Sequence, residues 1–326
     1  MNIGKVPEAV LKRSIIRQIK TRRPEIIMGA AVGEDCAAIQ LKEGEVFVMS
    51  TDPITGTSHE IGALAIHVTA NDIASSGAEV IGVMLSVLLP EGTQESELKA
   101  MMKQVEETCH SLNIQTIGGH TEVTRVVNQP VITVTGIGKI VKDALVTTGG
   151  ARPGDDVIVT KWIGLEGTSI IAHEKETELL KRFSTSFVET AAGFIQYLSV
   201  VPEAAVAVRH GVTAMHDVTE GGIFGALWEV AEASGVGLSI DLKSIPVRQE
   251  TIEVCEVFGL NPYQLISSGS MLITAPNGHD LVRRLGEEGI NASVIGKVTE
   301  GNDRVLVNED EVRYLEPPKS DELYKM

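Results

Sequence analysis

The sequence has no long hydrophobic run and no apolar leader. Its longest apolar stretch, Val80 to Leu89, contains Gly82 and Ser86 and is too short to cross a bilayer. Met1 to Lys20 intersperses charged and apolar residues, unlike the unbroken apolar stretch of a secretory signal peptide. We therefore expect a cytoplasmic protein that neither spans nor binds a membrane.

Basic residues are scarce relative to acidic ones. The chain of 326 residues has 28 Lys and Arg against 44 Asp and Glu, a formal net charge of −16, and no Lys/Arg-rich run. Because polyanions bind to clustered positive charge, the sequence predicts no nucleic-acid partner. A content of 43% hydrophobic and 22% charged residues is typical of globular proteins, and the length suffices for two cores.

Cysteine is also sparse. Cys36, Cys109 and Cys255 are widely separated and form no Cys-x-x-Cys pair, so neither a disulfide framework nor a thiolate zinc site is indicated. A reducing compartment is consistent with this usage. Cys36 lies inside a motif, and we interpret it as a small buried apolar residue.

Three common nucleotide and hydrolase motifs are missing. The sequence contains no Gly-x-x-x-x-Gly-Lys-Ser/Thr loop, no Gly-x-Gly-x-x-Gly after a strand and no Gly-x-Ser-x-Gly. The P-loop, Rossmann and serine-hydrolase classes are therefore excluded.

The apolar patterns predict an α/β chain in two domains. The first helix has a helical apolar stripe, other segments are called on residue composition and boundary residues, and the break at Thr147 to Asp156 has no apolar periodicity. We expect domains at 1–150 and 151–326, and a frayed end from Pro317 to Met326. The predicted helices are Val6–Lys20, Gly62–Ser76, Glu95–Leu112, Ser184–Arg209, Gly222–Ser234 and His279–Glu288. The predicted strands are Val46–Ser50, Val131–Ile137, Val157–Thr160, Val236–Ile240, Met271–Thr274 and Ser293–Val298.

Five acidic residues follow or end apolar runs beside small residues: Asp35, Asp52, Asp72, Glu122 and Asp217. Sites are often built at such ends, and a few carboxylates suit a Mg²⁺–polyphosphate complex. For any one of these residues, a turn or cap is an equally good interpretation. Their joint occurrence favours a site.

Two further polar features each have two interpretations. A helix starting at Gly222 would direct free N–H groups at an anion near Asp217, with Gly221 and Gly222 permitting close approach; an ordinary turn before a helix is the alternative. His67 and Asn71 are one helical turn apart, next to Asp72, and belong either to a ligand-binding face or to a hydrogen-bond network at a subunit contact. His120 is open to the same two interpretations.

Taken in order, several motifs resemble the aminoimidazole ribonucleotide (AIR) synthase, or PurM-like, superfamily over nearly the whole chain. They are Gly33-Glu-Asp-Cys-Ala-Ala-Ile39, Ser50-Thr-Asp52, His67-Val-Thr-Ala-Asn-Asp-Ile-Ala74, Gly118-Gly-His-Thr-Glu122, Asp217-Val-Thr-Glu-Gly-Gly222 and Ser267-Ser-Gly-Ser-Met-Leu-Ile273. The segment from Gly235 to the Asn261-Pro262 pair is most similar to the hydrogenase expression/formation branch of that superfamily.

The resemblance implies a fold, an assembly and a reaction. It implies a homodimer whose N-terminal domains pair their sheets into a shared β-barrel, and a C-terminal α/β domain with a mixed sheet. Members use Mg²⁺ and ATP to phosphorylate a carbonyl or amide oxygen, or another acceptor, of a small substrate. Electrostatic positioning supplies most of such catalysis.

The implied site residues come from both halves of the chain. The magnesium and phosphate ligands would be Asp35, Asp52, Asp72 and Asp217, and His120 would join Asp72 and Asp217 in catalysis. The nucleotide-binding set would also contain His67, Asn71, Gly118, Gly119, Glu122, Gly221 and Gly222.

The chain also departs from the branch it resembles. That branch ends in Pro-Arg-Ile-Cys, whereas no cysteine follows Cys255 here; His120 and Glu122 replace the usual Asp and Lys, and Glu220 replaces an Arg. We therefore expect no thiocarbamate on the chain's own C-terminus, and a changed substrate. Two alternatives to an active enzyme remain: a nucleotide-binding partner that has lost catalysis, and a hydrogenase-maturation protein that uses a cysteine from another chain.

Overall fold

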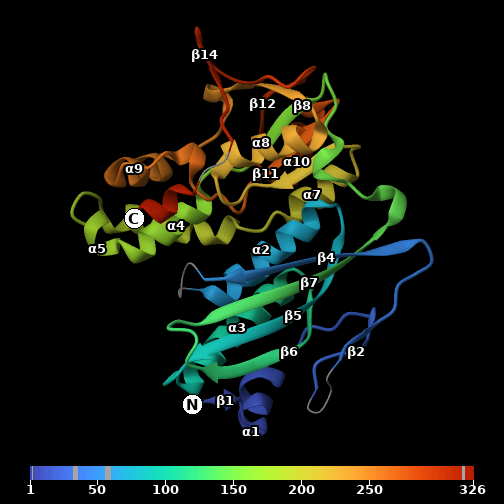
Figure 1. The fold of residues 1–326 in the computed structure, drawn as a ribbon, viewed down its shortest axis with the longest axis vertical. Helices are drawn as coiled ribbons and strands as arrows, with labels where there is room; N and C mark the ends of the chain where they lie inside the picture. Colours follow the sequence, from blue (N-terminus) through green and yellow to red (C-terminus); the bar gives the residue numbers. More distant parts are fainter. Residues whose placement is uncertain (2, 32–35, 56–59, 318–319) are drawn as a thin grey trace. The chain divides into compact units, whose positions relative to one another are not determined.

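The computed structural model describes residues 1, 3–31, 36–55, 60–317 and 320–326. These residues form two compact units, each with its own sheet (Figure 1). Unit 1 comprises Met1–Ile73 and Ala78–Asp143, and unit 2 comprises Ala74–Gly77 and Ala144–Met326.

Unit 1 is built on a five-stranded sheet in the order β1-β6-β5-β7-β4. The pair β5–β6 is parallel, and the other pairs are antiparallel. The strands are β1 (Gly4–Lys5), β4 (Glu45–Ile54), β5 (Glu79–Pro90), β6 (Gln115–Thr124) and β7 (Val131–Val141), with β2 (Ile26–Met28) and β3 (Ala38–Ile39) forming a separate ribbon. The helices are α1 (Glu8–Val10), the π-helical η1 (Leu11–Ile16), α2 (Ile61–Ser75), α3 (Glu95–Ser111) and the short η2 (Lys142–Ala144).

Two glycines let α2 lie directly against β7. A Cβ added at Gly136 would approach Thr69 Cγ2 to 2.6 Å, and one added at Gly138 would approach Ile73 Cγ2 to 2.4 Å. Both distances are far below ordinary van der Waals contact. Gly136 is paired with Ser50 of β4, so α2 packs on the sheet next to Ser50.

The opposite face of this sheet is only partly covered. The β2–β3 ribbon packs on a small cluster of Ile81, Ile117 and Ile137. Further along, Phe47 and Met49 of β4 are 48% and 61% exposed. They alternate with the residues that face α2, as a strand with a period of two requires.

Unit 2 contains a mixed sheet of seven strands in the order β14-β13-β10-β12-β8-β11-β9, as expected for the C-terminal domain. The pair β10–β13 is parallel, and the other pairs are antiparallel. The strands are β8 (Asp156–Thr160), β9 (Ala214–Asp217), β10 (Gly237–Asp241), β11 (Met271–Ala275), β12 (Ala292–Thr299), β13 (Arg304–Asn308) and β14 (Glu311–Tyr314). The α-helices are α4 (Leu165–Glu174), α5 (Glu176–Leu179), α6 (Thr185–Ala192), α7 (Val201–Val208), α8 (Gly222–Ser234), α9 (Gln249–Phe258) and α10 (Gly278–Glu287). Short 3₁₀ turns are η3 (Thr148–Gly150), η4 (Gly193–Tyr197), η5 (Leu242–Ser244), η6 (Pro262–Gln264) and η7 (Glu322–Lys325).

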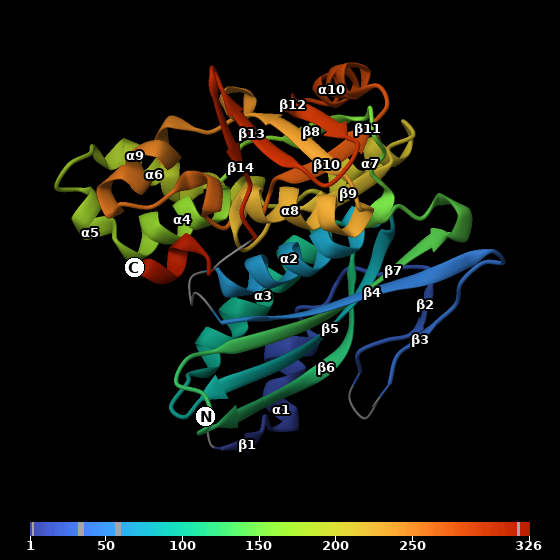
Figure 2. The same ribbon diagram turned by 45° about the horizontal axis from the view of Figure 1, so that its top comes forward.

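Hydrophobic cores lie on both faces of this sheet. Val157 and Val159 of β8 join a cluster with Ile223 and Leu227 of α8. Ile158, between them, joins a second cluster that contains residues of α7 and α10. Successive strand residues thus bury opposite faces, and helices cover both, as the turned view shows (Figure 2).

Two helical predictions, and one about the end of the chain, need correction. The first helix was expected over Val6–Lys20 but runs only from Glu8 to Ile16, and its part from Leu11 onward is π-helical. The single helix expected over Ser184–Arg209 is divided into α6, η4 and α7, and Pro202 lies in the first turn of α7 where no backbone donor is needed. The expected fraying of the last residues is also wrong, because Asp321 and Glu322 are buried.

In the described part of the chain, no one helix has the length and apolarity needed to cross a bilayer. The pair Thr185–Tyr197 and Val201–Val208 meets those criteria only when the two are joined across a 46° bend.

A buried ion pair fixes α7 to the end of β8. Lys161 forms a salt bridge with Glu203, and its amine also donates to the Ser199 carbonyl at 2.6 Å. Burial lowers the pKa of Lys161 and raises that of Glu203, so each charge depends on the other. We expect Glu203→Ala to lower the free energy of unfolding by about 3 to 5 kcal/mol, measured by urea denaturation. Glu309→Ala, which removes the exposed partner of Lys243, is the control and should cost under about 1 kcal/mol; equal losses would contradict the prediction.

Candidate active site

Two of the predicted carboxylates meet at one hydroxyl in unit 1. Ser50 and Asp52 are two residues apart on β4, so both side chains leave the strand on the face toward α2. The Ser50 hydroxyl lies 2.5 Å from Oδ2 of Asp72, which α2 supplies, and 3.1 Å from Oδ2 of Asp52. The structure therefore brings Asp52 and Asp72 to the same hydroxyl.

The arrangement is favourable for a hard cation. The Ser50 hydroxyl has one proton to donate, and the ionised carboxylates of Asp52 and Asp72 can only accept hydrogen bonds. One donor is therefore shared by two acceptors. Asp52 forms no ion pair with any described residue. Two carboxylates and a hydroxyl match the oxygen ligands of Mg²⁺. The described residues nevertheless contain no group of three or more His, Cys, Asp or Glu arranged to hold a metal, so this is a partial ligand set.

The described residues of unit 1 do not contain the other two predicted metal ligands. Asp35 lies outside them. Asp217 ends β9 in unit 2, where it is buried and paired in register with Met271. The convergence of all four carboxylates stays a prediction.

The polar residues of α2 lie beside Asp72 in the sequence and on the same helix. Asn71 is fully buried, and His67, one turn earlier, is partly exposed. Both side chains have interaction partners within the chain. Their assignment to nucleotide binding stays a prediction.

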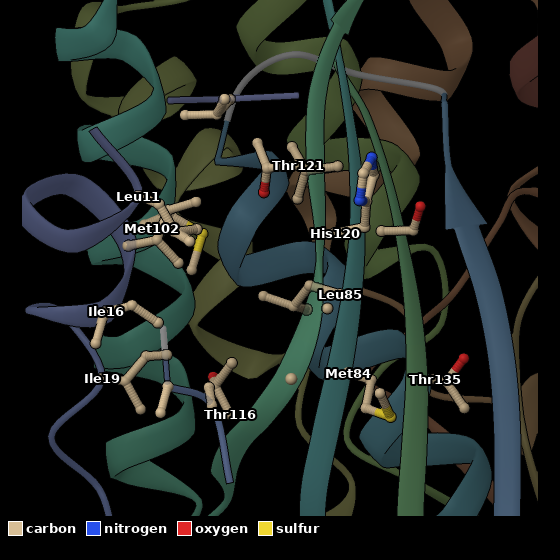
Figure 3. A pocket seen from close by; sticks show the side chains of 18 of the residues that line it. Leu11, Ile16, Ile19, Met84, Leu85, Met102, Thr116, His120, Thr121 and Thr135 are labelled. Carbon is tan, nitrogen blue, oxygen red and sulfur yellow. The ribbon is translucent and has the colours of Figure 1, made fainter. Parts of the chain in front are cut away.

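A cavity of about 550 Å³ opens along β6 (Figure 3). Leu11, Ile16 and Ile19 of the N-terminal helical segment and Met102 of α3 form an apolar wall on one side. The strand side carries polar residues: Thr116, Gly118, Gly119, His120 and Thr121. The structure thus places three predicted site residues, Gly118, Gly119 and His120, along one cavity.

Gly119 is required by the backbone at this point. Its φ is +144°, and an added Cβ would lie 2.1 Å from the Leu85 carbonyl oxygen. The β5–β6 register shifts between Val83 and Met84, whose partners on β6 are Thr116 and Gly118. Strand β6 therefore has a bulge beside the cavity. Only glycine permits this approach of β6 to β5.

His120 and Glu122 form a pair on one face of β6. His120 Nε2 lies 3.2 Å from Glu122 Oε2, and both side chains are partly exposed. They share a face because they are two residues apart on a strand. An imidazole hydrogen-bonded to a carboxylate can accept and return a proton.

The start of α8 is already occupied by a carboxylate. Gly221 has φ +83°, and its N–H donates to Asp321 Oδ2 at 2.7 Å, while the Gly222 N–H donates to the Thr219 carbonyl at 3.1 Å. The N–H groups of Gly221 and Gly222 are therefore engaged within the chain. An external anion would have to displace Asp321 from Gly221.

One assignment is wrong and two contributors were missed. Cys36 was interpreted as a buried apolar residue, but it is exposed and lines the cavity. It lies just before the two-residue strand β3, outside any core. Ser50 was quoted in a motif but given no role, although its spacing from Asp52 on a strand indicates a shared face. Asp321 was assigned to a frayed end; the preference of Asp for helix N-caps was the available signal, since it caps η7.

Comparisons with known proteins define the class. The N-terminal domain of AIR synthase related proteins matches residues 33–140, and the C-terminal domain matches residues 152–308. The chain therefore belongs to the AIR synthase related protein family.

Within this family the chain is similar to HypE proteins. It is 30% identical over 280 residues to the carbamoyl dehydratase HypE of Cupriavidus necator, covering 78% of this chain and 76% of the relative. A crystal structure of the hydrogenase maturation protein HypE in complex with ATP superimposes with a TM-score of 0.82 at 21% identity, covering 98% of this chain and 97% of that chain. A HypE–HypF complex matches with a TM-score of 0.74 at 22% identity, covering 85% and 92%. These structures share the fold.

Proposed function

We propose that this protein is an ATP-dependent enzyme that phosphorylates, and so activates, the oxygen of a carbonyl or amide substrate, in particular a carbamoyl group. The observation that carries the proposal is the meeting of Asp52 and Asp72 at Ser50, beside the glycine that lets α2 lie directly against β7. Family membership and the similarity to a carbamoyl dehydratase support it.

The chemistry fits a dehydration. The carbamoyl oxygen attacks the terminal phosphorus of ATP, the bond to ADP breaks, and the oxygen becomes part of a good leaving group. Loss of inorganic phosphate and of the two N–H protons then converts the carbamoyl group into a cyano group. We assign His120, oriented by Glu122, to accept one of these protons.

Magnesium would be held by Asp52 and Asp72, with Asp35 and Asp217 completing the proposed set. When bound, Mg²⁺ would neutralise charge on the phosphate oxygens. For the nucleotide, we propose the cavity along β6, whose volume of about 550 Å³ lies in the range of small-molecule sites. Its apolar wall suits a flat base, and its threonine and glycine side suits polar groups.

The proposal also includes an oligomeric state, a partner protein and a cellular location. We infer a homodimer that pairs the sheet faces carrying Phe47 and Met49, because exposed apolar side chains on a sheet favour association. A maturation protein partner is supported by the HypE–HypF complex among structural neighbours. A cytoplasmic location is consistent with the three cysteines, which are free.

The test is phosphate release from ATP, measured with and without Mg²⁺ and with a small S-carbamoyl thiol as acceptor. We expect release that requires Mg²⁺ and increases with the carbamoyl compound, together with a cyano product. Calorimetry on the same sample reports nucleotide binding. ATP binding without turnover on any carbonyl, amide or carbamoyl acceptor would instead favour a nucleotide-binding partner without catalysis.

A further inference from the structure

A second cavity is formed within unit 2, where the end of α8 meets the hairpin of β13 and β14. Its volume of about 470 Å³ lies in the range of small-molecule sites. Residues of unit 2 alone line it, so it is a different cavity from the one along β6. The lining residues used below are Trp228 and Glu232 of α8, Asn302 and Arg304 at the start of β13, and Tyr314 and Leu315 at the end of β14.

Arg304 provides the positive charge of this cavity from a buried position. The residue is only 8% exposed, and its Cζ lies 4.0 Å from the centroid of the Trp228 ring. Stacking on the indole holds the flat guanidinium in one plane. The directions of its N–H groups are therefore fixed before any ligand arrives.

One edge of this guanidinium is only half used. Nη2 of Arg304 donates to Oε2 of Glu232 at 2.6 Å. Nε, which lies on the same edge, is buried and has no hydrogen-bond partner among the described residues. The Nε and Nη2 N–H groups run parallel and match the two oxygens of one carboxylate. A buried donor on a charged group is costly to leave unpaired, so this edge favours a second acceptor oxygen.

Glu232 is an occupant that a ligand can displace. Its side chain is 66% exposed, and an ion pair with so exposed a partner contributes little to stability. Its position is set by α8, and it accepts from Nη2 and not from Nε. A free carboxylate has no such restriction and can accept from both groups. The exchange then pairs the donor that the chain leaves without a partner.

The remaining walls favour a flat, largely apolar body on that carboxylate. Trp228, Tyr314 and Leu315 line the cavity, and Tyr314 is 67% exposed. Aromatic side chains bind flat rings by offset stacking and by edge contacts. Asn302 adds an amide that can both donate to and accept from a polar substituent.

We propose that this cavity binds a small carboxylate with a ring in its body, and that Arg304 holds the carboxylate through Nε and Nη2 after Glu232 has moved away. The ring lies between the side chains of Tyr314 and Leu315 and the indole of Trp228. This inference rests on contacts within unit 2 and does not depend on ATP turnover.

Titration of the full chain with sodium benzoate, followed by NMR, tests the proposal. The chain has two tryptophans, so its spectrum contains two indole N–H signals, which Trp162→Phe assigns. We expect benzoate to shift the Trp228 signal in a saturable way and to leave the Trp162 signal in place. Benzamide has the same ring without the charge, and inorganic phosphate has charge without a ring. Each should bind at least about tenfold more weakly than benzoate.

Two substitutions change the affinity for benzoate in opposite directions. Glu232→Gln removes the competing carboxylate and should tighten binding about fivefold. Arg304→Lys keeps a positive charge but loses the edge with two parallel donors, and should weaken binding about tenfold. Glu309→Gln is the matched control, because Glu309 is an exposed ion-pair partner of Lys243 in the same unit, and it should bind benzoate like wild type.

Three results would overturn the proposal. They are a Trp228 signal that benzoate does not shift, benzamide or phosphate binding as tightly as benzoate, and a Glu232→Gln protein that binds benzoate no more tightly than Glu309→Gln. If circular dichroism shows that Arg304→Lys does not fold, the comparison of Glu232→Gln with Glu309→Gln decides, because both substitutions are at exposed side chains.

Discussion

Replacement of Asp72 by asparagine is expected to lower Mg²⁺-dependent ATP turnover on the order of 100-fold while leaving the fold intact. Asparagine has the same shape and its carbonyl can still accept from the Ser50 hydroxyl, so packing under α2 is preserved. What is lost is one of the two negative charges that meet at Ser50. Steady-state phosphate release measures the effect.

The matched control for this variant is Asp143→Asn. Asp143 is an exposed acid in η2 of the same unit, and its replacement should leave turnover near the wild-type rate. Urea denaturation of both proteins checks that folding is equal. Wild-type turnover by Asp72→Asn would remove Asp72 from the site, and loss of turnover together with loss of folding would assign it a structural role.

The second large effect is expected for Gly119→Ala. The backbone there has φ +144°, and the new Cβ would lie 2.1 Å from the Leu85 carbonyl oxygen, a contact with main chain that no side-chain rotation relieves. We expect the free energy of unfolding to fall by about 3 kcal/mol or more, because β6 must move away from β5.

The control variant Gly92→Ala separates the effect of the positive φ from the effect of the close contact with Leu85. Gly92 also has a positive φ, +95°, but no atom lies within 4 Å of an added Cβ, so only the backbone preference is affected. Its cost should be about 1 kcal/mol. Equal losses from the two variants, measured by thermal or urea denaturation, would show that the close approach of β6 to Leu85 contributes nothing.

Much of the fold could be predicted from local pattern. The strands β4 and β7 and the helices α2, α3 and α8 were predicted near their observed positions, because their residue composition and their glycine or polar boundaries are typical of these elements. β5 was not predicted as a strand. This central strand lies between β6 and β7, and its residues are mostly buried on both faces. Its sequence is therefore a nearly continuous apolar run without the alternation of apolar and polar residues that marks a half-exposed strand.

The site was harder to predict, because it depends on contacts between distant segments. The spacing of Ser50 and Asp52 determines a shared face, but that Asp72 reaches the same hydroxyl depends on how α2 lies on β7, which no local pattern encodes. The attachment of Asp321 to Gly221 joins residues 100 positions apart. The N-cap preference of Asp indicates a turn at Asp321, but it does not indicate that this turn is buried against α8.

The absence of side chains at Gly136 and Gly138 has a consequence for how turnover can vary in this protein. Any methyl group at either position would act as a wedge and lift α2, and with it the Asp72 carboxylate, away from Ser50. Turnover at the proposed metal site could therefore be tuned, or extinguished, by substitutions on a strand that contributes no charged group to that site.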